Sequence, residues 1–155
     1  MIVTGEEVAR FVSERLQTAF CPPYVAMGYE KDGQIVGGAL FNCFEGHDVH
    51  VSVAGKGWVP GFIEAVGNYV FHQLQCGRMT AITRDPKVVE YAKRLGGMVE
   101  GTLRDHFGPG QDGVLLGILR KDWPYGISIP SRAADRLHAL PEEGSVERGL
   151  QSQAA

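Results

Sequence analysis

One short stretch of the chain, residues 47–54, gathers side chains that can move a proton. Its sequence is typical of a β-strand, in which alternate side chains point to opposite faces of a sheet. One face is apolar and consists of Val49, Val51 and Val53. The other face is polar and consists of Asp48, His50 and Ser52. Histidine changes its charge near neutral pH, so His50 is the candidate general base of this polar face.

Two neighbours would assist His50 in that role. Asp48 would orient the imidazole, and Ser52 would hydrogen-bond the group that reacts. The alternative is a polar face that is solvated or hydrogen-bonded to neighbouring strands. A metal pair with His47 is excluded, because residues three apart on a strand point to opposite faces. No other spacing in the sequence resembles a zinc site.

The second candidate site is the glycine-bearing loop 55–61, which joins this strand to a predicted helix. Such a turn points free backbone N–H groups, and the positive end of the helix dipole, at one place. Lys56 adds a full charge beside them, so the natural ligand is a phosphate or pyrophosphate. The alternative is that the glycines only permit a tight turn. Their spacing matches neither a P-loop nor the dinucleotide fingerprint.

Hydrophobic periodicity and turn signals predict the elements that position these residues. Helices are expected over 4–18, 62–75 and 85–95, and strands over 24–30, 34–44, 47–54, 79–83, 98–104 and 113–119. Thr4 and Glu7 form a capping-box pattern for the first helix, and Asp85 is the expected N-cap of the last. The segment 47–83 is a crossover unit, so its two strands should be parallel neighbours. The predicted fold class is α/β (α+β), a mixed sheet with helices on its faces.

Size and charge narrow the possible functions. The chain has 155 residues, which is one ordinary domain, and a net charge of -3. This balance excludes binding of nucleic acid through a strong positive field, and no apolar run approaches the ~20 residues of a membrane span. The N-terminus has early acids and no basic segment, so no signal peptide is expected. Three cysteines then indicate free thiols in a reducing, cytoplasmic compartment; Cys43, in an apolar strand, is expected in the core.

In order and spacing, residues 1–123 resemble the GNAT superfamily of acyl-CoA-dependent N-acyltransferases. The resemblance rests on the hairpin Gly33-Gln34-Ile35-Val36-Gly37-Gly38, on the glycine loop that enters a helix, and on the helix 85–97. That helix is similar to the family's Asn-x-x-Ala-x-x-Leu-Tyr-x-Lys-x-Gly-Phe. The stretches 100–105 and 116–123 resemble the last two strands of the RimJ/RimL-like branch. The set is also similar to small GNAT proteins encoded by bacteriophages.

The resemblance implies a splayed sheet of about six to seven strands, with acyl-CoA bound where the fourth and fifth strands separate. The cofactor's pyrophosphate would lie on the loop amides, and its pantetheine would extend the sheet. A primary amine, of a small molecule or of a protein N-terminus or lysine, would attack the thioester of acetyl-CoA directly. No metal is implied. The expected contacts to CoA are Val51, Val53, Gly55, Lys56, Gly57, Trp58, Val59, Gly61, Phe62, Asp85, Val88 and Tyr91.

Several departures from the family pattern keep a second hypothesis open. Ala92 stands where the family often has a tyrosine acid, and Tyr91 lies one position early, roughly 100° around the helix. Asp85 replaces the usual asparagine, Gly97 replaces the closing phenylalanine, and Pro60 removes one amide from the loop. The alternative is therefore a degenerate GNAT-fold module, used for binding or structure without catalysis.

Other segments allow more than one interpretation. Trp58 either covers the cofactor or is an apolar plug, and Arg104 either binds an acidic group of the substrate or pairs with Asp105 or Asp112. A C-terminal extension, 124–155, follows the GNAT domain, with a short helix expected over 131–140 and a polar, mobile tail after it. That helix would dock on its own domain or on a second subunit, so a homodimer is possible.

Overall fold

The computed structural model of the chain describes residues 1–126, and the helix expected over 131–140 and the tail after it lie outside these residues. The described part contains a mixed, seven-stranded sheet in the order β1-β2-β3-β4-β5-β7-β6. The elements of the first half are β1 (Ile2–Thr4), α1 (Glu6–Leu16), β2 (Val25–Lys31), β3 (Gln34–Asn42) and β4 (Asp48–Gly55). Those of the second half are α2 (Pro60–Gly67), the π-helical segment η1 (Asn68–Gln73), β5 (Arg78–Thr83), α3 (Pro86–Arg94), β6 (Met98–Leu103), β7 (Gly113–Leu119) and the 3₁₀ turn η2 (Arg120–Asp122). The predicted fold class is confirmed.

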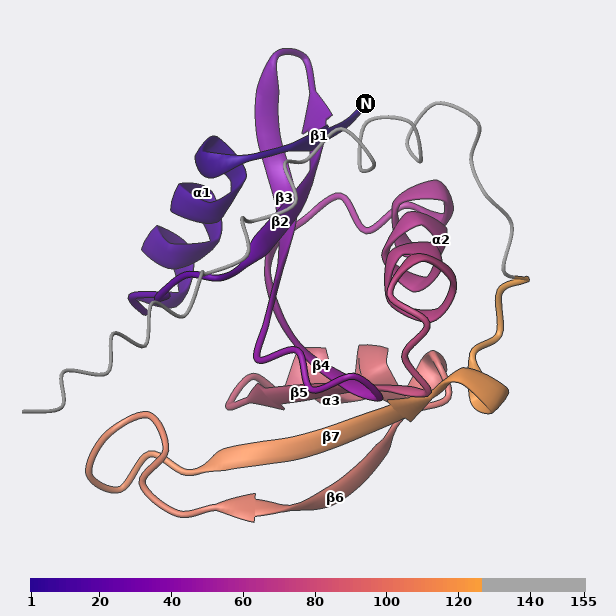
Figure 1. Cartoon of the computed structure of the whole chain (residues 1–155). Helices are drawn as coiled ribbons and strands as arrows, with labels where there is room; N and C mark the ends of the chain where they lie inside the picture. The colour runs from indigo at the N-terminus through magenta and orange to yellow at the C-terminus, as the bar shows by residue number, and fades with distance from the viewer. Residues whose placement is uncertain (127–155) are drawn as a thin grey trace, which may run out of the picture.

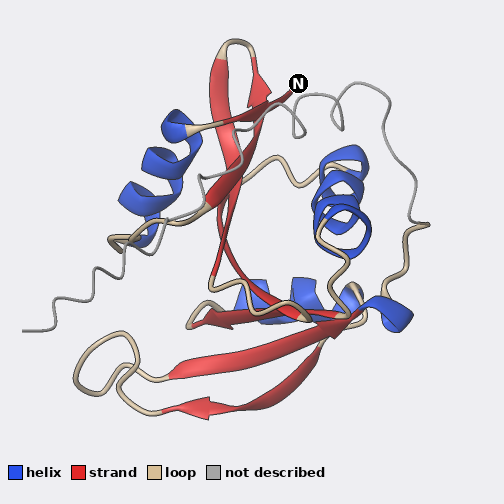
Figure 2. Cartoon of the chain, viewed as in Figure 1, coloured by secondary structure: helices blue, strands red, loops and turns tan. Residues whose placement is uncertain are grey.

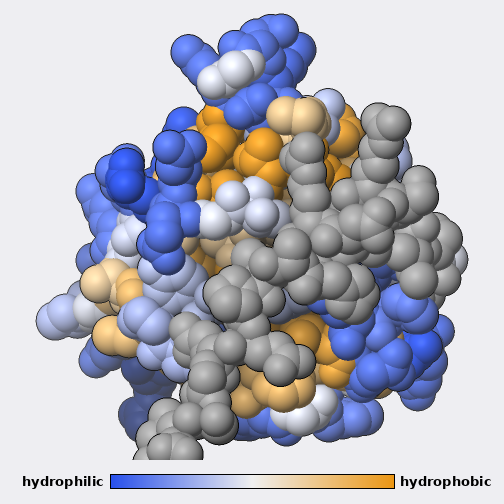
Figure 3. Space-filling view, turned by 45° about the horizontal axis from the view of Figure 1, so that its top comes forward, coloured by the Kyte–Doolittle hydropathy of each residue, from blue (hydrophilic) through white to orange (hydrophobic). Residues whose placement is uncertain are grey.

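Two layers of side chains pack against opposite faces of the sheet. α1 covers one face of β2, β3 and β4, and α2 covers the other (Figures 1 and 2). Under α1, Val8 and Val12 are fully buried and pack in one cluster with Leu40 and Ala54. The larger cluster joins α2 and η1 to the strands and to Ala92 of α3. Hydrophilic residues border the apolar ones on the face drawn in Figure 3.

The N-terminal strand β1 is not among the elements expected from the sequence. It pairs antiparallel with β2 over three residues, which is too short to show a period-2 pattern. Because Thr4 belongs to this strand, α1 begins at Glu6 behind Gly5, whose φ is 111°, and no side chain caps it. The predicted capping box of Thr4 and Glu7 is therefore wrong.

The hairpin between β2 and β3 is confirmed at the predicted turn. Asp32 and Gly33 form a two-residue connection with φ values of 52° and 74°, as in the type I′ turns that suit tight hairpins. At the other end of β3, Cys43 lies one residue beyond the strand, with φ at 50°, and is exposed. Its expected place in the core is wrong, because the strand ends before it.

The helix predicted over 62–75 starts two residues earlier than expected, at Pro60, and widens into a π-helix from Asn68. In this wider turn the N–H of Leu74 donates to the carbonyl of Tyr69 at 2.9 Å. No helix within residues 1–126 is both long enough and apolar enough to cross a membrane.

α3 is capped at both ends, and its N-cap is the predicted Asp85. The Asp85 carboxylate accepts a hydrogen bond from the N–H of Lys87 at 2.9 Å. At the other end Gly96 has a φ of 83°, and the N–H of Gly97 donates to the carbonyl of Ala92 at 2.8 Å. This is the Schellman arrangement that ends many helices at glycine.

Replacing Asp85 with alanine should lower the free energy of unfolding by about 0.5–2 kcal/mol, because the variant leaves a helix N–H without its cap. Urea unfolding of the two proteins measures the difference. Asp85→Ser keeps a capping oxygen and should stay near the wild-type value. Equal losses in both variants would show that the contribution of Asp85 to stability does not come from the capping hydrogen bond.

Candidate cofactor and catalytic site

The parallel strands β4 and β5 stay together only at their beginnings. Their register pairs are Asp48 with Arg78, Val49 with Met79, and His50 with Thr80. Beyond these pairs β4 continues to Gly55 beside β3, and β5 continues to Thr83 beside β7. The expected separation of the two strands is confirmed, and it begins directly after His50.

This separation leaves part of the β4 backbone without a partner strand. The N–H of Lys56 donates to the carbonyl of Val36 on the β3 side at 2.6 Å. Because hydrogen-bonded and non-hydrogen-bonded pairs alternate in an antiparallel ladder, the even-numbered residues of β4 bond to β3. The N–H and C=O groups of Val51 and Val53 therefore face away from β3, on the side where β5 has departed. The Val51 side chain itself is buried in the core, so this valine can offer only backbone to a ligand.

The loop after β4 is held tightly against the first residues of β3. Gly55 and Gly57 have φ values of 82° and 84°, which glycine adopts without strain. A Cβ on Gly37 would lie 2.1 Å from the carbonyl oxygen of Lys56, so the two backbones touch. Gly61 differs, because its φ is not positive and a Cβ there would meet nothing within 4 Å. No packing or backbone requirement of the fold accounts for glycine at position 61.

Several N–H groups of this loop are unused. Those of Lys56 and Val59 donate to backbone carbonyls. Within residues 1–126, the N–H groups of Gly57, Trp58 and Gly61 have no hydrogen-bond partner. They surround the N-terminus of α2, where the helix dipole is positive and Pro60 supplies no donor. Together with the exposed Lys56 they form a site suited to an anion.

Trp58 lies on the core and is also well placed to border that site. Its ring stacks on Phe62 with the centroids 5.0 Å apart, and its Nε1–H donates to the carbonyl of Gly55 at 3.3 Å. Phe62 is buried, and its N–H bonds to the carbonyl of Val59 at 2.9 Å. Phe62 therefore supports the loop from below and has no free polar group for a ligand.

The expected cofactor residues of α3 lie at its first turns and on its surface. Asp85 uses one carboxylate oxygen as the helix cap, and Val88 is half-buried. Tyr91 is exposed, with the Arg94 guanidinium 5.7 Å above its ring. Ala92 faces inward and is part of the core. The position at which the resemblance would place a tyrosine acid therefore has only a methyl group, which lies in the core.

The polar face of β4 has the predicted alternation. Val49 is buried on one face, while Asp48, His50 and Ser52 are half-buried on the other. His50 stands between Asn42 of β3 and Thr80 of β5 in the register of the sheet.

The predicted pairing of Asp48 with His50 is not present, and no hydrogen bond joins them within residues 1–126. The Asp48 carboxylate accepts the Thr80 hydroxyl proton, with oxygen distances of 2.9 and 2.7 Å, and lies 3.5 Å from Nε of Arg78. Arg78 in turn meets Glu100 of β6 at 2.7 Å. The hydrogen bond between them raises the pKa of Arg78 and lowers that of Glu100. Sequence reasoning missed this cluster, although Arg78 and Thr80 share a strand face at the predictable spacing of two.

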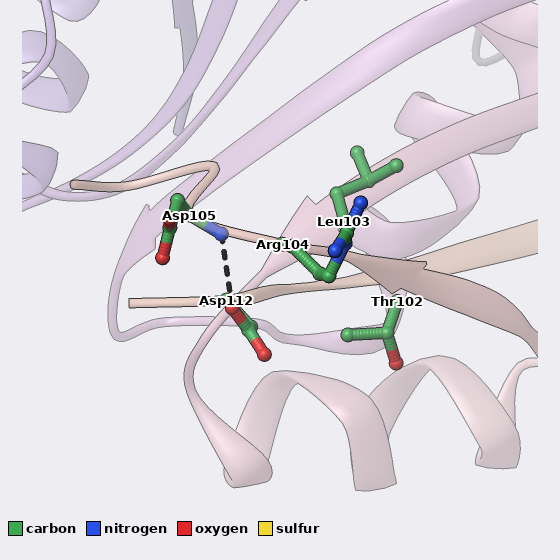
Figure 4. A pocket seen from close by; sticks show the side chains of 5 residues that line it. All are labelled: Thr102, Leu103, Arg104, Asp105 and Asp112. Atoms are coloured by element: carbon green, nitrogen blue, oxygen red, sulfur yellow. Dashed lines mark hydrogen bonds between the residues drawn. The ribbon is translucent and has the colours of Figure 1, made fainter. Parts of the chain in front are cut away.

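A shallow hollow lies at the far end of the β6–β7 hairpin, lined by Thr102, Leu103, Arg104, Asp105 and Asp112 (Figure 4). The N–H of Asp105 donates to the Asp112 carboxylate at 2.9 Å. Within residues 1–126, Arg104 forms no ion pair with either aspartate, so the pairing that was one of its two interpretations is not present. Its guanidinium remains available to a ligand or to solvent.

The described part of the chain holds no metal cluster, and its buried phenol is not a neutral-pH acid. Residues 1–126 contain no group of three or more His, Cys, Asp or Glu placed to hold a metal ion. Burial raises the pKa of the Tyr69 phenol to about 12, so this side chain keeps its proton. Tyr69 packs on Phe41 in the core.

No protein-family model and no curated protein sequence matches the chain. Solved structures do resemble it. A crystal structure of variants of the spermidine/spermine N-acetyltransferase SpeG from Vibrio cholerae superposes with a TM-score of 0.61 at 16% identity, covering 78% of this chain and 95% of that one. SpeG from the same organism in complex with manganese ions gives a TM-score of 0.60 at 15% identity, with 78% and 92% covered. The chain therefore has the fold of the GNAT acetyltransferases.

Proposed function

We propose that the chain is an acyl-CoA-dependent N-acyltransferase that moves the acetyl group of acetyl-CoA to a primary amine. A shared fold does not by itself carry an activity, so the proposal rests on the site. One observation carries it: β4 loses its parallel partner after His50, and its unpaired backbone leads directly into a loop with three free N–H groups. An extended ligand with an anionic end matches both parts of this arrangement.

The residues present fit acetyl-CoA in three places. The backbone groups of Val51 and Val53 would hydrogen-bond the amides of the pantetheine, as a partner strand would. The N–H groups of Gly57, Trp58 and Gly61 would hold the pyrophosphate, with Gly55 shaping the turn, Lys56 adding charge and Val59 at its rim. Asp85, Val88 and Tyr91 of α3 would border the remaining part of the cofactor. When bound, acetyl-CoA supplies the thioester that reacts.

The chain's own side chains would handle the proton of the amine. His50 accepts that proton as the nitrogen attacks, and Ser52, on the same strand face, hydrogen-bonds the acyl or amine group. Asp48 is assigned to the strand junction in place of its expected role with His50. Ala92 has no proton to give. A CoA thiol is about as acidic as free cysteine, near pKa 8.5, so it can leave as the thiolate.

The acceptor is a primary amine, of a small molecule or of a protein N-terminus or lysine. SpeG is described as a spermidine/spermine N-acetyltransferase. Spermidine and spermine therefore belong among the first amines to be tested as acceptors. The motifs in the stretches 100–105 and 116–123 favour the RimJ/RimL-like branch and a similarity to small bacteriophage-encoded proteins of this fold. The proposal also includes a cytoplasmic location for the protein and its assembly into a homodimer.

A second candidate function is a GNAT-fold module that binds without catalysing. Two observations favour it: Ala92 replaces the usual acid, and Asp48 is engaged by Thr80 and Arg78. A ligand other than CoA, or none, would then use the loop.

A thermal-shift measurement separates the two candidates. Acetyl-CoA at 100-fold over its Kd should add about 2.7 kcal/mol to the free energy of unfolding, which is about 5–11 °C in Tm for a domain of this size. Desulfo-CoA should give a similar shift, and adenosine, which lacks the pyrophosphate, should give a much smaller one. The absence of any shift with acetyl-CoA, succinyl-CoA or free CoA at millimolar concentration would contradict the transferase proposal.

A further inference from the structure

A polar cluster joins three strands at the place where β4 and β5 separate. Its centre is Thr80, which is only 4% exposed and donates its hydroxyl proton to the Asp48 carboxylate. Arg78 donates to the Thr80 oxygen from Nε at 3.2 Å and from Nη2 at 3.1 Å. Arg78 also reaches Glu100 from Nη1 at 3.2 Å and from Nη2 at 2.7 Å. Every hydrogen-bonding atom of the buried hydroxyl is therefore occupied.

Two local irregularities in the sheet allow the cluster to form. The register of β6 against β7 shifts between Val99 and Gly101, so Glu100 is the extra residue of a β-bulge. Glu100 then lies across β7, above Gly117, where a Cβ would come within 2.2 Å of its carboxylate. Without the bulge and the glycine, a carboxylate on β6 would not reach a guanidinium on β5.

The cluster is adjacent to the candidate base. Thr80 forms the last register pair between β4 and β5, and its partner in that pair is His50. Asp48 and His50 are two residues apart on one strand, so both point to the face that carries the cluster. The hydrogen bond from Thr80 to Asp48 thus joins β4 to β5 directly beside His50, at the end of their pairing.

We infer that Thr80 is a positioning residue for the transfer reaction, which acts by fixing β4 to β5 at their last shared pair. This inference rests on the proposed function. The point where the strands separate decides which backbone groups of β4 are free for the cofactor, and this point lies directly after His50. Catalysis is sensitive to such placement, since a misplacement of about 1 Å costs on the order of 100-fold. Arg78 holds the Thr80 oxygen and neutralises Asp48, so that the half-buried carboxylate is not left unpaired.

The test compares Thr80→Val with Thr80→Ser. Valine keeps the shape of threonine and loses the hydroxyl, whereas serine keeps the hydroxyl. In Thr80→Val we expect the backbone amides of residues 49–51 to exchange their hydrogens at least ~10-fold faster. We expect kcat to fall by about 10- to 100-fold, with KM and Kd for acetyl-CoA within about 2-fold of wild type. Thr80→Ser should retain most of kcat, and Arg78→Met should repeat the exchange result. Thr102→Val, at an exposed position of β6, is the matched control.

The outcomes are distinguishable. Unchanged kcat and unchanged amide exchange in Thr80→Val would overturn the inference. Equal losses of kcat and of acetyl-CoA affinity would also overturn it, because they indicate general disruption of the fold. If the wild-type chain acetylates no amine, the proposed function fails and the catalytic role of Thr80 fails with it. The exchange rates of Thr80→Val and Thr80→Ser would still decide whether the hydroxyl holds the strands together.

Discussion

Replacing His50 with alanine should lower the turnover number by about 10²–10⁴-fold, the usual contribution of a general base. The affinity for acetyl-CoA should remain nearly unchanged, because the expected cofactor contacts are backbone groups of β4 and its loop. His50→Gln should be no more active, since glutamine keeps a hydrogen bond but cannot take the proton. His72→Ala, which removes a half-buried histidine from η1, is the control.

Turnover can be followed by the release of CoA thiol with whichever of the tested amines reacts fastest. The exposed thiols of Cys21 and Cys43 would react with the same reagent, so they must be subtracted as a protein blank. Full activity of His50→Ala between pH 6 and 8 would refute the assignment. The base would then be a solvent-bridged group, or the amine would arrive already neutral.

Replacing Gly61 with alanine should weaken acetyl-CoA binding by about 10- to 150-fold without harm to the fold. The new methyl group has open space around it in the free protein, and alanine is the better helix former. Side chains on a helix lean toward its N-terminus, so the methyl would stand beside the free N–H groups of the loop. The estimate is the loss of one hydrogen bond to a charged group, about 1.5–3 kcal/mol.

Gly101→Ala is the matched control for this variant. A methyl group at Gly101 would also meet nothing within 4 Å, and its φ is not positive, but Gly101 lies on β6, away from the loop. Isothermal titration calorimetry gives the Kd for acetyl-CoA, and thermal unfolding tests the fold. If Gly61→Ala binds acetyl-CoA as tightly as the wild type, the pyrophosphate does not lie on this part of the loop.

The sequence predicts those parts of the site whose geometry depends only on residues close together in the chain. The alternation of valines and polar residues along β4 indicates its two faces, and Asp85 with Pro86 indicates the start of α3. Both follow from the geometry of one strand or one helix turn. The parallel pairing of β4 with β5 follows from the rule that a strand–helix–strand crossover joins parallel strands of one sheet. This rule applies almost as widely as the local ones.

The predictions that differ from the structure fail for one physical reason. Each depends on contacts between residues that are far apart in the sequence. Spacing along the strand pairs Asp48 with His50, its nearest titratable neighbour on that face, yet the partners of Asp48 come from β5. Glu100 reaches Arg78 only because a bulge and a glycine on different strands coincide. Likewise the local pattern makes Thr4 a helix cap, because its pairing with Met27 is invisible in a short window of sequence.

The contact between Gly37 and Lys56 means that the position of the candidate anion-binding loop is set by residues outside the loop. Gly37 pairs with Tyr29 in β2 and with Gly55 in β4, so the register of the N-terminal hairpin is passed on to the loop. An engineer who transplanted only residues 55–61 into another scaffold would move the donors without their support. The smallest portable unit runs from the start of β3 to the first turn of α2. Within that unit a side chain at position 37 would be as disruptive as one in the loop itself.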